Sequence, residues 1–126
     1  PAGKPFWQAD AANEAQPVLG PGGKWVAAHF SERHDVILRS GKAGELATRL
    51  QRGHSRDVTL AADPVRHRVA LLGRDGRLRV VDVFLDEVLW SAWGHARGSR
   101  PGGALAYHPR GEWLASGGQD GTVRLW

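Results

Sequence analysis

Apolar and polar residues alternate along this chain in short runs. In segments such as 77–80 (RLRV) and 122–125 (TVRL), every second residue is apolar. This period of two is typical of half-buried β-strands, and no stretch of the sequence shows convincing helical spacing. The pattern predicts eleven strands, near residues 16–20, 25–30, 35–39, 45–50, 57–62, 68–73, 77–82, 87–93, 103–108, 112–117 and 122–126.

Two kinds of turn signal separate the predicted strands. Asp-Gly dipeptides stand between alternating runs at 75–76 and 120–121. Asp-Gly in such a place predicts a two-residue hairpin turn with positive φ angles. Pro64 and Pro109 each end an apolar run, because proline has no N–H to offer a strand ladder. The chain is therefore expected to be all-β, with antiparallel hairpins.

The strand pattern repeats with a period of about 43 residues. The segment at 68–83 (RVALLGRDGRLRVVDV) aligns with that at 112–126 (EWLASGGQDGTVRLW), at a spacing of 45. The same spacing of 45 separates Pro64 from Pro109, and a weaker first copy begins at 20–30 (GPGGKWVAAHF). Four short antiparallel strands in each period of 40 to 45 residues indicate the blades of a β-propeller.

The sequence resembles the WD-repeat β-propeller family from about residue 7 to residue 126. The resemblance is carried by the Asp-Gly turns, by Gly-His dipeptides at 53–54 and 94–95, and by AYHPRGEWLASGGQDGTVRLW at 106–126. The third copy matches the family closely, the second moderately and the first poorly. Where the family has tryptophan, the second copy has Val81 and the first has Arg39. The resemblance implies a propeller of four-stranded antiparallel blades.

The strand count predicts how the blades divide the chain. Residues 1–126 are expected to form a single unit of three blades, with blade 1 at 15–52, blade 2 at 53–93 and blade 3 at 94–126. Blade 3 then has three strands and lacks its outer one. The segment at 4–10 is the expected twelfth strand, which completes a blade of a neighbouring chain.

Three blades alone do not close a ring, since typical propellers contain about 4 to 8 of them. We therefore expect other chains to complete the ring, with a six-bladed homodimer favoured and a trimer as the alternative. In the dimer, Phe6 and Trp7 of one chain would lie beside Trp126 of the other, so that a head-to-tail contact covers every strand edge. A further alternative is that the chain is a piece of a longer propeller that a different chain completes.

The resemblance also implies a structural network of hydrogen bonds within each blade. In the family this network joins the histidine of the Gly-His dipeptide, a serine or threonine of the second strand, the turn aspartate and the tryptophan of the third strand. Tryptophan only donates, so the other groups can relay hydrogen bonds towards the aspartate. Only the third copy has all four residue types, which are His95, Ser116, Asp120 and Trp126.

The second copy keeps only part of this set. His54 and Asp75 stand at the histidine and aspartate positions, but Leu71 and Val81 replace the serine and the tryptophan. The network in blade 2 is therefore expected to be partial, and the blade to be held mainly by apolar packing.

Composition argues against several kinds of chemistry. The sequence has no cysteine, so it has no disulfide, thiolate metal site or cysteine nucleophile. Its six histidines lack the short spacings of common zinc sites. No apolar run approaches the roughly 20 residues that a membrane span needs. We expect no catalytic residue, no cofactor, no metal and no membrane contact, and we expect a cytoplasmic location.

A protein partner is expected at one rim of the ring. The resemblance implies rim contacts from residues that precede each turn aspartate or enter an innermost strand, and the basic, glycine-rich loop at 94–103 adds two arginines. Arginine suits such contacts because its planar guanidinium both donates hydrogen bonds and stacks. The candidate rim residues are Arg56, Asp57, Arg74, Gln119, Arg97 and Arg100.

The sequence therefore predicts a non-catalytic scaffold for protein–protein interactions. The alternatives are an enzyme or an anion-binding propeller that uses arginines of the channel or the rim. The innermost strands QPVLG, DVTLAAD and GGALAYH are too apolar to favour an enzyme. The net charge of +4 comes from arginines interspersed with carboxylates, which does not favour a nucleic-acid partner.

Overall fold

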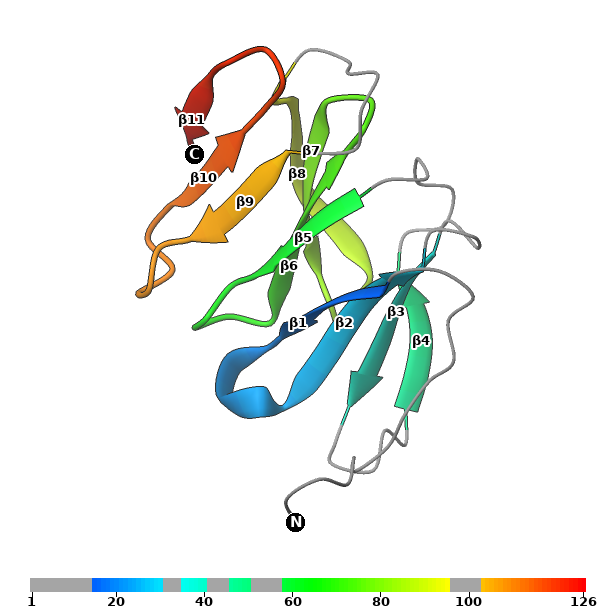
Figure 1. Cartoon of the computed structure of the whole chain (residues 1–126). Helices are drawn as coiled ribbons and strands as arrows, with labels where there is room; N and C mark the ends of the chain where they lie inside the picture. Colours follow the sequence, from blue (N-terminus) through cyan, green and yellow to red (C-terminus); the bar gives the residue numbers. More distant parts are fainter. Residues whose placement is uncertain (1–14, 31–34, 41–45, 51–57, 96–102) are drawn as a thin grey trace, which may run out of the picture.

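A computed structural model describes residues 15–30, 35–40, 46–50, 58–95 and 103–126. These residues form eleven β-strands and one short 3-10 turn at Pro21–Gly23 (Figure 1). The predicted all-β fold is confirmed, and each strand begins and ends within two residues of its predicted bounds. Among the residues described, no helix has the length and apolar character needed to cross a membrane.

The strands form three antiparallel sheets, in which each strand pairs with its neighbour in the sequence. We call the sheets blade 1, blade 2 and blade 3. Blade 1 contains β1 (Ala15–Leu19), β2 (Trp25–Phe30), β3 (Asp35–Ser40) and β4 (Leu46–Leu50). Blade 2 contains β5 (Val58–Ala62), β6 (Arg68–Gly73), β7 (Arg77–Asp82) and β8 (Glu87–Trp93). Blade 3 contains β9 (Ala104–Tyr107), β10 (Leu114–Gly117) and β11 (Val123–Leu125). The twelfth strand predicted at 4–10 lies outside the described residues.

The Asp-Gly turns are one residue longer than predicted. The loop between β6 and β7 has three residues, 74–76, and only Gly76 has a positive φ, of 82°. The carboxylate of Asp75 accepts the backbone N–H of Arg77 at 3.1 Å, which holds the aspartate at negative φ. The N–H of Gly118 donates to the carbonyl of Thr122 at 3.2 Å and closes a similar loop at 119–121, in which Gly121 has a φ of 75°. The prediction of a two-residue turn was therefore wrong. Each hairpin has a three-residue loop, in which only the glycine has a left-handed φ.

The blades stack face to face, with β1, β5 and β9 on the same side of the stack (Figure 1). Because side chains alternate across a strand, each sheet presents one face to the preceding blade and the other to the following blade. In blade 2, Leu71 points towards blade 1 and Leu72 towards blade 3. Blade 2 is thus apolar on both faces.

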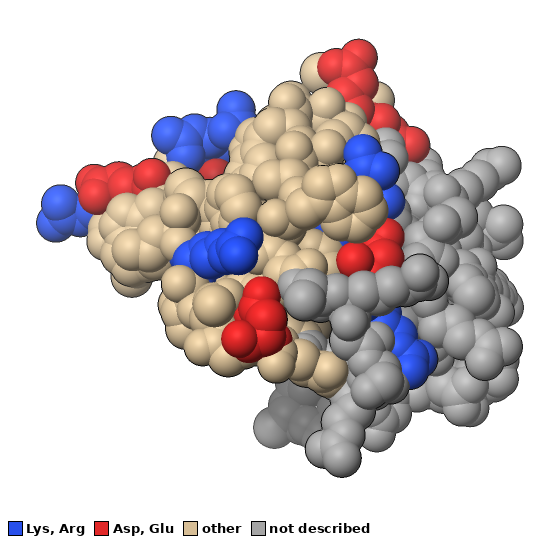
Figure 2. Space-filling view, turned by 90° about the horizontal axis from the view of Figure 1, so that it is seen from above, with Lys and Arg blue, Asp and Glu red and all other residues tan. Residues whose placement is uncertain are grey.

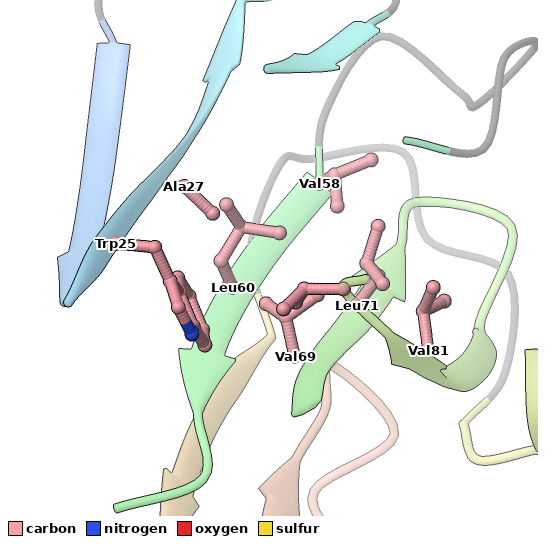
Figure 3. Close-up of a cluster of buried hydrophobic side chains, with 8 residues drawn as sticks. Trp25, Ala27, Val58, Leu60, Val69, Leu71 and Val81 are labelled. Carbon is pink, nitrogen blue, oxygen red and sulfur yellow. The ribbon is translucent and has the colours of Figure 1, made fainter. Parts of the chain in front are cut away.

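Two apolar clusters fill the two junctions. Figure 3 shows the junction of blades 1 and 2, where Trp25 and Ala27 of β2 pack against β5 and β6. The buried residues there are Trp25, Ala27, Val58, Leu60, Val69, Leu71, Val81 and Val83. Those at the junction of blades 2 and 3 are Ala61, Ala70, Leu72, Leu78, Val80 and Leu114. The second cluster is completed by partly buried Leu105, Tyr107 and Trp126.

Trp25 is the largest side chain of the first junction, and only 1% of its surface is exposed. Its indole Nε1 donates a hydrogen bond to Nδ1 of His67, in the turn before β6, at 3.1 Å. Gly20 makes room for the indole, since a Cβ at this position would collide with the ring. The buried indole of Trp25 and its hydrogen bond to His67 therefore help to hold blade 1 against blade 2.

Replacing Trp25 tests this fastening. Trp25→Ala is expected to lower the free energy of unfolding by about 3–5 kcal/mol, because it leaves a cavity between the blades. Trp25→Phe keeps a ring and should cost less. Urea unfolding followed by circular dichroism gives both values. Trp93→Ala is the control, since 68% of Trp93 is exposed, and it should change stability by no more than about 0.5 kcal/mol. Equal losses at Trp25 and Trp93 would contradict this account of the junction.

Candidate functional site

A buried network of hydrogen bonds joins the four residues that the sequence singled out in blade 3. His95 Nδ1 lies 3.0 Å from Asp120 Oδ1, and His95 Nε2 lies 2.8 Å from Ser116 Oγ. Trp126 Nε1 donates to the same Ser116 oxygen at 2.9 Å. The network links the second residue after β8, strand β10, the β10–β11 loop and the residue that follows β11.

The donors and acceptors of this network follow from its tryptophan. An indole N–H can only donate, so Ser116 Oγ accepts from Trp126 and directs its own proton to His95 Nε2. His95 then carries its ring proton on Nδ1 and donates it to Asp120. Asp120 also accepts from the side chain of Thr122 at 2.7 Å and from its backbone N–H at 3.1 Å. Every bond therefore leads to the carboxylate.

Two residues that complete this network were not predicted from the sequence. Thr122 supplies two donors to Asp120. Gly118 lies against the His95 ring, where a Cβ would collide with the imidazole. The signal for Gly118 was the Gly-Gly doublet at 117–118, directly before the turn. Thr122 follows the Asp-Gly dipeptide, where its amide can reach the turn carboxylate.

Ser116, His95 and Asp120 include the residue types of a catalytic triad, but their placement differs from one. A nucleophile must reach a substrate, whereas only 1% of Ser116 is exposed. The hydroxyl donates its proton to His95 and accepts from Trp126. In this arrangement the three residues bind strands together.

Blade 2 lacks this network in the part that the structure describes. Leu71 and Val81 occupy the serine and tryptophan positions and are fully buried in the first junction. Asp75 stabilises its own turn by accepting the N–H of Arg77. His54 lies outside the described residues.

The predicted rim is described at two of its six positions. Arg74 and Gln119 are exposed and stand at matching places in the two hairpin loops. Arg56, Asp57, Arg97 and Arg100 lie outside the described residues, as do Phe6 and Trp7. In the view from above, described Lys and Arg side chains are interspersed with Asp and Glu and separated by uncharged surface (Figure 2).

Two of the described histidines, His67 and His108, pack against aromatic rings. The rings of His67 and Phe84 are 4.6 Å apart between centroids, and those of His108 and Trp113 are 4.8 Å apart. Within the described segments, no group of three or more His, Cys, Asp or Glu residues could hold a metal ion.

The outer face of blade 3, which points away from blade 2, is apolar and exposed. Strand pairing places Ala115 beside Ala106 and Leu125, and Gly117 beside Ala104 and Val123. Val123 is 76% exposed and Leu125 is 66% exposed. This surface, which we call the blade 3 outer face, consists of Ala104, Ala106, Trp113, Ala115, Gly117, Val123 and Leu125.

A groove of about 450 Å³ lies between blades 2 and 3. Tyr107 borders it, and burial raises the pKa of its hydroxyl to about 12, with the nearby carboxylate of Asp63 adding to the rise. Arg68 and Arg66 act in the opposite direction on this pKa but do not cancel the increase. The phenol is therefore a neutral hydrogen-bond donor at physiological pH.

The three antiparallel sheets are stacked face to face, as the blades of a β-propeller are. The family model of the WD domain, G-beta repeat, matches residues 102–126. A chain in the crystal structure of a mitotic checkpoint complex is similar to this one, with a TM-score of 0.73 and 22% sequence identity. The alignment covers 96% of this chain and 37% of the solved chain. A search of curated protein sequences gave no match. Residues 102–126 thus match a WD repeat, and the chain has the fold of a β-propeller.

Removing the hydroxyl of Ser116 tests the network. Ser116→Ala leaves His95 Nε2 and Trp126 Nε1 without partners in a buried place, which should cost about 1–3 kcal/mol of unfolding free energy. Urea unfolding measures the loss. Arg110→Ala changes an exposed residue of the turn before β10 that lies outside the network and serves as the control. A loss no larger than that of the control would show that the network does not stabilise blade 3.

The alkaline titration of Tyr107 provides a second test. It is the only tyrosine in the sequence, so its phenolate absorbance can be followed alone. Its pKa is 10.0 for an unperturbed group and about 12 in the fold. Above pH 10 the unfolded chain loses this proton first, so the tyrosine's contribution to stability falls as the pH rises towards 12. Tyr107→Phe should remove this part of the pH dependence. A folded midpoint near pH 10 would contradict the burial.

Proposed function

We propose that this protein is a non-catalytic scaffold for protein–protein interactions that works as part of a closed WD-repeat propeller. The WD repeat at 102–126 and the propeller neighbour support the scaffold role. That neighbour is a chain of a multiprotein complex, the mitotic checkpoint complex. The exposed loop residues Arg74 and Gln119 are the described part of the proposed partner-binding rim.

The exposed apolar surface of the blade 3 outer face is the main observation that supports a closed ring. Ala115, Val123 and Leu125 stand 45 residues after Ala70, Leu78 and Val80, which are buried where blade 2 meets blade 3. The same register positions are therefore apolar in both blades, but in blade 3 they are exposed. Large exposed apolar patches mark interaction sites in soluble proteins. The surface fits a further blade.

A second copy of the chain is the proposed source of the missing blades. The free face of blade 1 is also apolar, since Leu19 is 68% exposed and pairs with Val26. Contact between blade 1 of one copy and blade 3 of the other, made twice, gives a six-bladed ring, within the usual range of about 4 to 8 blades. Phe6 and Trp7 of one copy are proposed to pair beside Trp126 of the other.

The alternative is a ring completed by blades from a different chain. It draws support from the solved neighbour, of which this chain spans only 37%. The cytoplasmic location remains a prediction from the absence of cysteine.

The mass in solution decides between these two arrangements. Light scattering should give about 27 kDa, twice the 13.7 kDa of one chain. Trp7→Asp should shift the protein to single chains if that indole seats in the neighbour, whereas Trp93→Asp, an equal change at an exposed tryptophan of β8, should leave the mass unchanged. A folded single chain of 13.7 kDa would exclude the homodimer and favour completion by a different chain.

A further inference from the structure

The two blade junctions differ at one equivalent position. Trp25 and Arg68 are each the first residue of the second strand of a blade. The carbonyl oxygen of each accepts a backbone N–H from the end of the preceding strand, at 2.9 Å from Gly20 and at 3.0 Å from Asp63. By strand alternation both side chains point towards the following blade.

At the first junction the side chain at this position fills the space between the two blades. Trp25 is buried and donates its indole proton to His67, the residue before β6 in blade 2. Shape and hydrogen bonding both match, so the space between the two sheets is filled.

At the second junction the corresponding pair is Arg68 and Glu112. Arg68 stands where blade 1 has Trp25. Glu112 of blade 3 corresponds to His67 of blade 2, because each comes directly before the first residue of the aligned second-strand segment. Within the described chain no hydrogen bond or ion pair joins their side chains. The groove of about 450 Å³ occupies this space, which is within the range of roughly 300–1,000 Å³ typical of ligand sites. Its lining includes Arg68, Tyr107, Glu112, Trp90, Trp126 and Leu114.

Two indoles supply the apolar wall of the groove. Trp90 of β8 and Trp126 lie with ring centroids 5.8 Å apart and their planes inclined by 32°. The hydrogen bond from Trp126 to Ser116 fixes the orientation of its ring. The buried network of blade 3 therefore holds one side of the groove rigid.

Hydrogen-bond donors line another part of the groove. Among the described residues, no hydrogen bond or ion pair engages the Arg68 guanidinium or the Tyr107 hydroxyl. Asp63, the nearby carboxylate, is already occupied, because it accepts the N–H groups of Val65 and Arg66 and pairs with the Arg66 side chain at 3.4 Å. The Arg68 guanidinium and the Tyr107 hydroxyl can therefore donate hydrogen bonds to a ligand. A guanidinium binds a carboxylate especially strongly.

We propose that this groove binds an extended peptide that packs an aromatic or aliphatic side chain against Trp90 and Trp126 and places a carboxylate on Arg68 and Tyr107. Two arginines and two carboxylates line the groove, so its charges balance and do not suit a polyphosphate chain. Glu112, whose Oε2 lies 3.7 Å from His108 Nδ1, also lines the groove. The site is distinct from the rim. It borders Trp126, beside which Phe6 and Trp7 of a second copy are proposed to pair, so this inference rests on a ring that leaves the groove open.

The probe follows from strand geometry. Residues i and i+2 of an extended peptide point to the same side, so we choose acetyl-Gly-Phe-Gly-Glu-Gly-amide and its glutamine counterpart. NMR titration of the tryptophan indole N–H signals should show shifts at Trp90 and Trp126, with at least about tenfold weaker binding of the glutamine peptide, the difference of one charge-assisted hydrogen bond. No shift on the folded protein at millimolar peptide would overturn the proposal, as would competition by a single-stranded oligonucleotide.

Two variants of groove residues test whether the peptide binds in the groove or elsewhere on the protein. Arg68→Gln should weaken binding of the glutamate peptide about tenfold, whereas Arg124→Gln, an equal charge change at an exposed residue outside the lining, should leave it unchanged. The double variant Arg68→Trp with Glu112→His recreates the closed pair of the first junction. It should abolish binding without lowering the melting temperature. Unchanged binding in either groove variant would show that the peptide binds elsewhere.

Discussion

The structure depends on the packing of apolar sheet faces against one another. A single blade is too thin to enclose a core, so each sheet buries its side chains only when a neighbour covers them. Blade 2 shows the satisfied state, with one face against blade 1 and the other against blade 3. The blade 3 outer face has the same kind of residues in the same register but stays exposed. Blade 2 is thus buried on both faces, whereas blade 3 is buried only on the face towards blade 2.

The blades reach similar geometry by different means. Blade 3 ties its strands with a relay from Trp126 through Ser116 and His95 to Asp120. Blade 2 has leucine and valine at two of these positions and relies on burial. A polar network must be fully satisfied to stabilise a core, whereas apolar packing tolerates substitution. This difference explains how repeats of unequal similarity to the family adopt one fold.

Much of the fold could be predicted from the sequence, because strand alternation and the repeat are local signals. The four network residues were also predicted, since the third copy keeps the family pattern. The length of the Asp-Gly turns was not, because it depends on which N–H the aspartate carboxylate accepts. The groove was not predicted either. It lies between Arg68 of blade 2 and residues of blade 3, and no single repeat carries that information.

A repeat fold allows one position to change at one junction while the others hold the blades in place. At the first junction the buried indole of Trp25 contributes packing and a hydrogen bond. At the second junction, Arg68 makes no such contact. The blades are held there by the packing of Leu72, Leu78 and Leu114. Arg66 also donates a hydrogen bond to the carbonyl of Gly111 at 3.0 Å. Gly111 suits this place because its φ is +70° and a side chain there would press on Asp63. Since the junction is secured on both sides of Arg68, the open space beside it does not loosen the stack. A groove with fixed walls is the condition for selective binding, because little order must be gained when a ligand enters.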